Sequence, residues 1–188
     1  MLRMNIGIEH GNFEYRKKYL KRPVKDEVII NSFNAVAGRN YTTVANSIIG
    51  MPDETRDLIL DTVELSRKLP KEIDASGAFV WAPYHGSALR DLAVKKGYLD
   101  DDTIVEHAIT GDSYLDMPSI SKAEIGGLAS TFSFYVKFPR ERFPEIKLAE
   151  RQDDAGKRIH AQLSQEFDSK YSGTLDPTKT SSEIIMQG

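Results

Sequence analysis

The fold is decided by the segment LRMNIGIEHGN (residues 2–12), in which a predicted strand runs into a polar loop. Over residues 2–8, apolar side chains alternate with polar or small ones, which is typical of a strand with one buried face. The apolar set is Leu2, Met4, Ile6 and Ile8, and Glu9 continues the opposite face. Asn12 is a candidate N-cap for a helix that begins near Phe13. The segment therefore predicts a β-loop-α unit.

The same order of strand, polar loop and helix occurs twice more in the N-terminal half. Residues 42–49 are rich in β-forming side chains, and GMP at 50–52 separates them from a helix predicted over 54–69. A third strand is predicted over 76–81, followed by PYHG at 83–86 and a helix to about residue 96. An amphipathic helix over 26–37, with Val28 on its apolar face, lies between the first two strands. Three consecutive units predict an α/β fold of parallel strands joined by right-handed crossovers.

Polar residues cluster where each predicted strand ends, at 9–12, 51–54 and 83–86. In barrels and open α/β sheets, the carboxyl ends of parallel strands meet at one mouth, where ligands bind. The sequence therefore predicts a binding site built from three successive loops.

The pattern changes near residue 100, where a helical extension begins. Ser121 and Glu124 have the spacing of a capping box and open a helix to about residue 138. A short helical piece lies between prolines, and a final helix is predicted over 153–171. Residues 172–188 are polar and aperiodic, so we expect a disordered tail. The predicted division is 1–99, 100–171 and 172–188.

Composition excludes several classes of function. The 188 residues carry a net charge of −3, which argues against nonspecific nucleic-acid binding. No apolar run is long enough for a membrane span or a signal peptide, so we expect a cytoplasmic protein. The sequence has 0 cysteines, which excludes disulfides, a thiol nucleophile and any cysteine-ligated cluster within this chain.

Three features could bind a ligand, and each has an ordinary structural alternative. Glu9 could accept hydrogen bonds from a ligand amine or ribose, or it could form an ion pair within the protein. Gly50 and Glu54 open a turn where backbone approaches a ligand closely, or they form a routine strand-to-helix turn. The basic run at 16–22 is either a solvated helix face or the source of one arginine that binds a carboxylate.

A divalent metal site is a further alternative. Two histidines and a carboxylate at the predicted mouth, His10, His85 and Glu9, have the residue types for it. No H-x-H or H-E-x-x-H spacing is present, so hydrogen-bonded structural histidines are the favoured interpretation.

Three blocks together resemble the second half of the radical S-adenosylmethionine superfamily core. They are MNIGIEHGN at 4–12, ANSIIGMPDET at 45–55 and PYHGSALR at 83–90. Their order and spacing match, and the resemblance extends over residues 2–171. The most similar subgroup is the cobalamin (B12)-binding type, in which a B12 domain precedes the radical barrel.

This resemblance implies a half of a partial, TIM-type (β/α)6 barrel with a helical C-terminal extension, and S-adenosylmethionine as a small-molecule cofactor. Six residues would then have cofactor-binding roles. Glu9 would contact the methionine amine or the ribose, Arg22 the methionine carboxylate, Asn46 the ribose and Tyr84 the adenine, while Gly50 and Glu54 would shape the adenosine-binding turn.

The chain also departs from the family pattern. The loop of three cysteines that holds a [4Fe–4S] cluster, the first three strands and a B12-binding motif are missing. Asn46 stands where glycine is frequent, and His10 where serine is frequent. We therefore expect a fragment of a longer radical enzyme, or a chain completed by a partner subunit, that is inactive alone. The alternatives are a metal-dependent hydrolase or isomerase using His10, His85 and Glu9, and a non-catalytic partner module.

Overall fold

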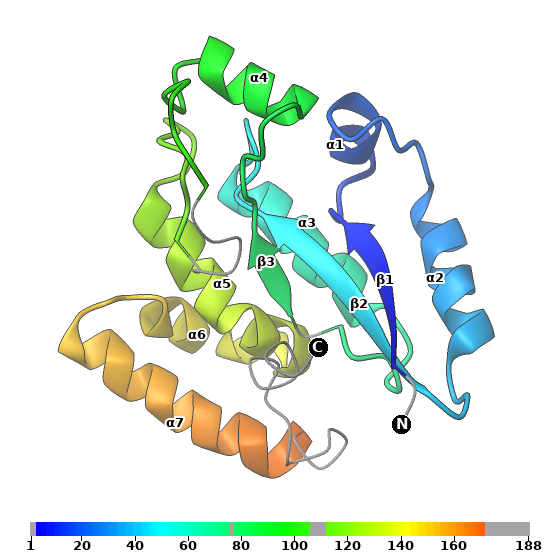
Figure 1. Ribbon diagram of the computed structural model, residues 1–188. Helices are drawn as coiled ribbons and strands as arrows, with labels where there is room; N and C mark the ends of the chain where they lie inside the picture. The colour runs from blue at the N-terminus through cyan, green and yellow to red at the C-terminus, as the bar shows by residue number, and fades with distance from the viewer. Residues whose placement is uncertain (1–2, 76, 106–111, 172–188) are drawn as a thin grey trace.

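Three parallel strands form the centre of the protein, whose computed structural model describes residues 3–75, 77–105 and 112–171 (Figure 1). They are β1 (Arg3–Glu9), β2 (Thr42–Ile49) and β3 (Ala78–Val80), hydrogen-bonded in the order β1-β2-β3. Ile6 lies opposite Ala45, and Ile48 lies opposite Phe79. The predicted α/β class and the parallel strands are confirmed, as a small open sheet.

Seven α-helices and one 3₁₀ helix are present in the described residues, and most begin at a side-chain cap. They are α1 (Phe13–Lys18), α2 (Asp26–Val36), α3 (Arg56–Arg67), α4 (Ala88–Lys95), α5 (Lys122–Lys137), η1 (Arg140–Arg142), α6 (Phe143–Ala149) and α7 (Asp154–Tyr171). The side chain of Asn12 caps α1, and the capping box of Ser121 and Glu124 is formed at α5, as predicted. None of these helices is long and apolar enough to cross a membrane. The predicted tail over 172–188 lies outside the described residues.

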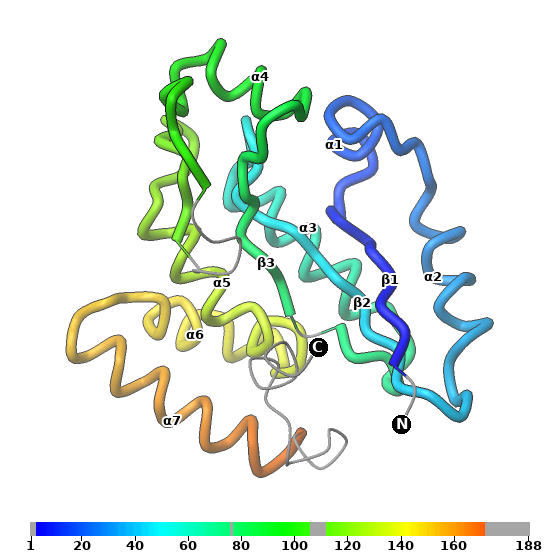
Figure 2. Tube along the Cα trace, in the orientation of Figure 1, coloured from blue at the N-terminus to red at the C-terminus, as the bar shows by residue number. Residues whose placement is uncertain are grey.

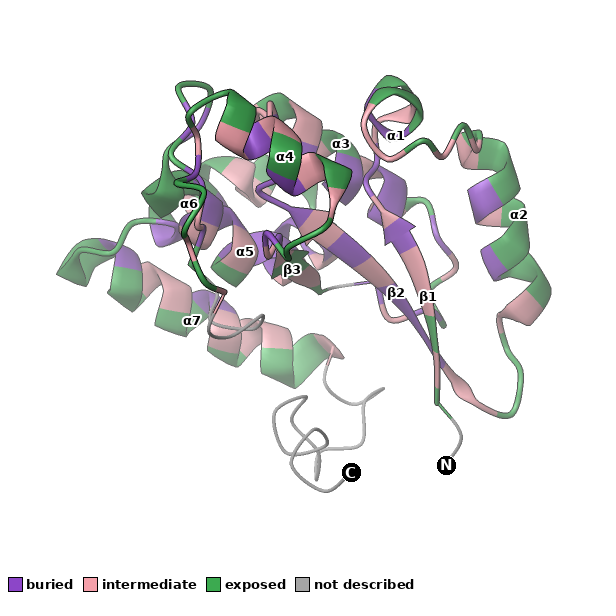
Figure 3. Cartoon of the chain, turned by 45° about the horizontal axis from the view of Figure 1, so that its top comes forward, coloured by how far each residue is buried: buried purple, intermediate pink, exposed green. Residues whose placement is uncertain are grey.

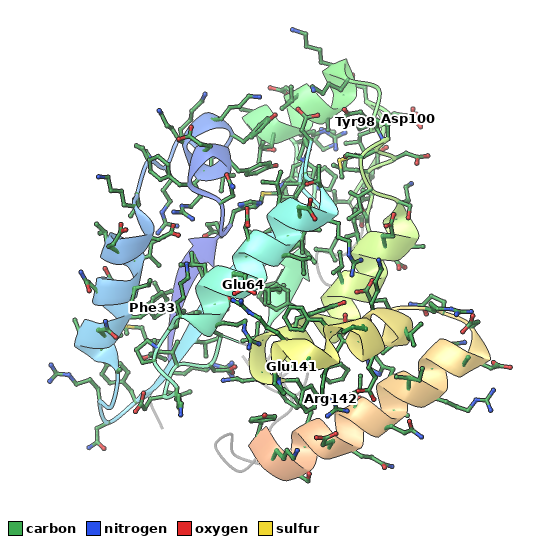
Figure 4. The ribbon with its side chains drawn as sticks, turned by 180° about the vertical axis from the view of Figure 1, so that it is seen from behind. Phe33, Glu64, Tyr98, Asp100, Glu141 and Arg142 are labelled. Atoms are coloured by element: carbon green, nitrogen blue, oxygen red, sulfur yellow. The ribbon has the colours of Figure 1, made fainter. Side chains whose placement is uncertain are left out.

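The helices leave the two faces of the sheet unequal. Figure 4, seen from behind, shows α3 in front of the strands, with Phe33 of α2 beside the sheet. Ile8 and Ala45 on this face pack with Phe33 and with Leu65 of α3. A larger core joins α3 and α5, so the two predicted segments 1–99 and 100–171 share apolar packing. No described helix covers the other face, which we call the open face (Figures 1 and 3).

Two local expectations need correction. Val28 was predicted to face inward from its helix, but it is 55% exposed, whereas Ile29 and Phe33, four residues apart, are buried. The α3 helix begins at Arg56 rather than near residue 54, because Thr55 is its N-cap. Glu54 thus belongs to the preceding turn.

Three arginines hold the irregular segments by binding backbone carbonyls. Arg16 and Arg90 are buried, and each guanidinium has multiple acceptors, as does that of Arg67 in α3. Carbonyls of loops and of the last turn of a helix lack helix or sheet partners, so a guanidinium with several N–H donors stabilises them. The acceptors are the carbonyls of His10, Gly11 and Val24 for Arg16, of Tyr135, Val136 and Phe138 for Arg67, and of Pro83, Asp101 and Thr103 for Arg90.

Gly11 lets the first loop touch α3, which yields a prediction. Its N–H donates to Thr62 Oγ1 at 2.8 Å, and a Cβ at this position would lie 2.2 Å from the carbonyl oxygen of Asp61. Since that oxygen belongs to a helix backbone, Gly11→Ala is expected to lower the free energy of unfolding by about 2 kcal/mol. Chemical denaturation measures this.

The matched control is Gly77→Ala, because a Cβ at Gly77 would meet no atom within 4 Å. This variant should stay within ~0.5 kcal/mol of wild type. Equal stability of the two variants would contradict the close approach at Gly11.

Candidate functional site

A cavity of about 460 Å³ opens on the open face, near the carboxyl ends of the strands. Three of the six predicted site residues, Glu9, Asn46 and Tyr84, lie together in its lining. The complete lining is Gly7, Glu9, Asn46, Ile48, Phe79, Val80, Trp81, Ala82 and Tyr84, and we call this cavity the pocket. The residues come from all three strands and from the loop that follows β3. Of the three predicted loops, 9–12 contributes Glu9 and 83–86 contributes Tyr84, whereas 51–54 contributes no residue to the lining.

One side of the pocket carries hydrogen-bonding groups. Glu9 ends β1 at an irregularity of the register and has a φ of 65°, and its side chain is 34% exposed. The carboxylate folds back over Gly7, where a Cβ would lie 2.1 Å from Glu9 Oε1. Asn46 lies opposite Gly7 across the β1–β2 pair. A carboxylate and a carboxamide therefore share this side.

The other side of the pocket is apolar and largely aromatic. Ile48 and Phe79 are cross-strand neighbours, and Trp81 and Tyr84 follow on the same chain. Phe79 is 46% exposed and Tyr84 is 55% exposed, so both rings present surface to solvent. Exposed rings beside hydrogen-bonding groups suit a flat ligand with a polar end.

Arg22 lies beside the pocket without lining it. Its Nη1 donates to the carbonyl of Gly7 at 2.9 Å and lies 3.9 Å from Glu9 Oε1. Both side chains are partly exposed, so an opposite charge pair is accessible next to the pocket. Within the same basic run, the sequence did not reveal that Arg16 is buried and structural.

Gly50 and Glu54 were predicted in the site, but neither lines the pocket. Glu54 is fully buried, and its Oε2 accepts hydrogen bonds from Gly50 N at 2.5 Å and Met51 N at 3.0 Å. Gly50 adopts a φ of 78°, and a Cβ there would lie 2.9 Å from a side-chain carbon of Ile125 in α5. The carboxylate thus closes the turn that follows β2.

His10 joins this turn to the first loop. Its Nδ1 accepts the N–H of Asn12 at 3.0 Å, so in the neutral ring the proton resides on Nε2, which lies 2.9 Å from Glu54 Oε1. The imidazole stacks on Tyr15 with ring centroids 4.1 Å apart. Burial, together with the charge of Glu54, raises the pKa of Tyr15 well above its usual value, and the hydroxyl donates to the Pro52 carbonyl.

Asp53, which the sequence analysis predicted only as part of a polar loop, accepts several side-chain hydrogen bonds. Its carboxylate accepts from Tyr19, Lys96 and Tyr98. Partial burial would raise the pKa of Asp53, but hydrogen bonds from Lys96 and the two tyrosines outweigh it and lower the pKa below 3.8. No local signal marks these partners, because Lys96 and Tyr98 are far along the chain.

The structure does not gather the residues of the predicted metal alternative. His10 is buried against Glu54 and does not line the pocket, whereas Glu9 does. In the ranges that the structure describes, no three His, Asp or Glu side chains are grouped so that they could hold a metal ion. A hydrolase site of His10, His85 and Glu9 therefore lacks its ligand set here.

No protein-family model matches the sequence, and the search of curated proteins gave no match.

The buried carboxylate of Glu54 yields a prediction. In Glu54→Gln, the side-chain NH₂ would face either His10 Nε2–H or the N–H groups of Gly50 and Met51. Two hydrogen-bond donors would then face each other, and a buried polar group would lose its acceptor. The free energy of unfolding should fall by roughly 3 kcal/mol. Thermal and chemical denaturation measure this change.

Glu64→Gln is the matched control, because Glu64 pairs with Arg140 at the surface, where Arg140 is 66% exposed. Its expected loss is below about 1 kcal/mol. A Glu54→Gln variant as stable as Glu64→Gln would show that the turn does not need the carboxylate.

Proposed function

We propose that this chain is the S-adenosylmethionine-binding half of a radical S-adenosylmethionine enzyme of the cobalamin-binding type. The observation that carries the proposal is the convergence of Glu9, Asn46 and Tyr84 on one pocket. These residues belong to the three sequence blocks that resemble the family.

The donor and acceptor groups around the pocket suit this cofactor. S-adenosylmethionine has an ammonium group and ribose hydroxyls, and Glu9 and Asn46 can accept hydrogen bonds from them. Its adenine can stack on exposed aromatic rings such as Tyr84. Its carboxylate can pair with Arg22, which lies next to Glu9. A volume of about 460 Å³ is in the ordinary range for a small-molecule site.

Gly50 and Glu54 act indirectly in this proposal. The Glu54 carboxylate fixes the backbone of Gly50 and Met51, and thereby the end of β2 that carries Asn46 four residues earlier. The two residues shape the turn beside the cofactor and do not contact it.

The chemistry is divided between this chain and other polypeptide. With 0 cysteines, the chain has no thiolates for a [4Fe–4S] cluster, so such a cluster would be held by other polypeptide. When bound elsewhere, such a cluster would supply the electron for reductive cleavage of S-adenosylmethionine. This chain binds and orients the cofactor. We further propose that its sheet is half of a partial barrel, completed by the rest of a longer chain or by a partner subunit.

Cofactor binding can be followed through Trp81, the only tryptophan in the sequence, which lines the pocket. Adding S-adenosylmethionine should change its fluorescence saturably. Glu9→Gln removes the charge that accepts the ammonium or ribose, and it should raise Kd about tenfold.

Glu14→Gln is the control, because Glu14 is exposed on α1 and outside the pocket. Its Kd should equal that of wild type. Absence of binding by wild type would refute the proposal and favour a non-catalytic partner module.

The proposal that other polypeptide holds the cluster gives a second prediction. The purified, unsupplemented chain, mixed with S-adenosylmethionine and dithionite, should release no 5′-deoxyadenosine, because it has no ligands for the cluster. Chromatography of the reaction mixture measures the product. Release of 5′-deoxyadenosine would contradict the assignment of the cluster to other polypeptide.

A further inference from the structure

Asp53 brings together three segments that are distant in the sequence. Its two carboxylate oxygens accept from Lys96 Nζ at 2.7 and 2.6 Å, from Tyr98 OH at 3.0 Å and from Tyr19 OH at 2.7 Å. Asp53 itself lies in the turn between β2 and α3 and has a φ of 62°. The turn thereby contacts the end of α1 and the end of α4.

Lys96 and Tyr98 lie just after the last residue of α4, and the N–H of Tyr98 donates to the carbonyl of Ala93 in this helix at 2.9 Å. Lys96 is the C-cap of this helix, and its ammonium also lies 5.7 Å from the ring centroid of Tyr98. The hydrogen bond from Lys96 holds Asp53 ionised, and the same bond raises the pKa of Lys96. The contact is therefore an ion pair supported by a phenol.

The N-terminal end of α4 is tied to the pocket loop. Ser87, the N-cap, donates from Oγ to the carbonyl of Tyr84 at 2.9 Å, and Arg90 Nη1 donates to the carbonyl of Pro83 at 2.8 Å. The segment from residue 83 to the helix therefore moves with α4. Tyr84 lies in this segment and lines the pocket. Trp81, which also lines the pocket, precedes the segment; its N–H donates to the carbonyl of Ile49 in β2, and it belongs to the same apolar core as Ala93 of α4.

Apolar packing of α4 involves Ala93, which is buried, and Leu89 and Val94, which are partly buried against the same core. Arg90 and Ala93 are its buried residues, whereas α5 buries eight. Figure 2 shows the chain rising from β3 directly into α4, which lies at the top of the view above the strand ends, and Figure 3 shows the largely exposed outer side of this helix. Polar contacts at the two ends of α4 must therefore set much of its position.

We infer that Asp53 is a positioning residue for the pocket, which holds α4 through Lys96 and Tyr98 and so keeps Tyr84 and Trp81 in place at the other end of the helix. Asp53 does not touch the ligand; it acts through α4. The effect on S-adenosylmethionine rests on the proposed function, whereas the effect on Trp81 does not.

The test uses Lys96→Met in the full chain, with Lys95→Met, a change at the neighbouring exposed lysine, as matched control. Tyr98→Phe removes a single hydroxyl and provides a second, milder variant. In the absence of ligand, acrylamide quenching of Trp81, which is 9% exposed, should increase roughly twofold in Lys96→Met and less in Tyr98→Phe. Lys95→Met should behave as wild type, and circular dichroism should show the same helix content in all variants.

A double-mutant cycle tests the route through Tyr84. Lys96→Met should raise Kd for S-adenosylmethionine several-fold in the wild-type background and leave it unchanged in the Tyr84→Ala background. An equal increase in both backgrounds would overturn the action through Tyr84.

The quenching measurement separates the two proposals. Increased quenching of Trp81 in Lys96→Met, with no cofactor binding by any chain, would support the positioning role and refute the proposed function. Quenching equal to that of Lys95→Met would overturn the positioning role, whatever the cofactor affinity of wild type.

Discussion

A carboxylate buried at the end of a parallel sheet requires hydrogen-bond donors, and Glu54 obtains them from the backbone of its own turn. Its second oxygen faces His10, whose other nitrogen accepts from the backbone of the first loop. Two loops that follow neighbouring strands are thereby joined. Glu9 precedes His10 directly, so the position of the pocket carboxylate depends on this buried contact.

The unequal faces of the sheet explain where the pocket forms. Alternation along β2 sends Ala45 toward α2 and α3, and Asn46 and Ile48 toward the open face. Because the helices of the described residues gather on one side, the other side retains hydrogen-bonding groups and exposed rings that packing would otherwise bury. Glu9 and Arg22 place both signs of charge beside it.

The elements that line the pocket are fixed by buried polar contacts at the strand ends and by α4. Glu54 and His10 fix the ends of β1 and β2, whereas Asp53 and Arg90 fix the two ends of α4. A cofactor with a zwitterionic end and a flat end would span the two sides of the pocket. In the proposed enzyme, this chain would orient the cofactor while other polypeptide supplies the electron.

The sequence by itself determined the three strands, their parallel direction, most helix boundaries and the caps at Asn12 and Ser121, because alternation, periodicity and capping act over a few residues. The resemblance of three sequence blocks to a known family pointed to Glu9, Asn46 and Tyr84, and these residues line one pocket, while their cofactor-binding roles stay a prediction. Only the tertiary structure decided that Glu54 and Gly50 lie behind the pocket and that Asp53 binds Lys96. Such contacts depend on which side of a turn a side chain takes and on partners dozens of residues away, and no local pattern encodes either.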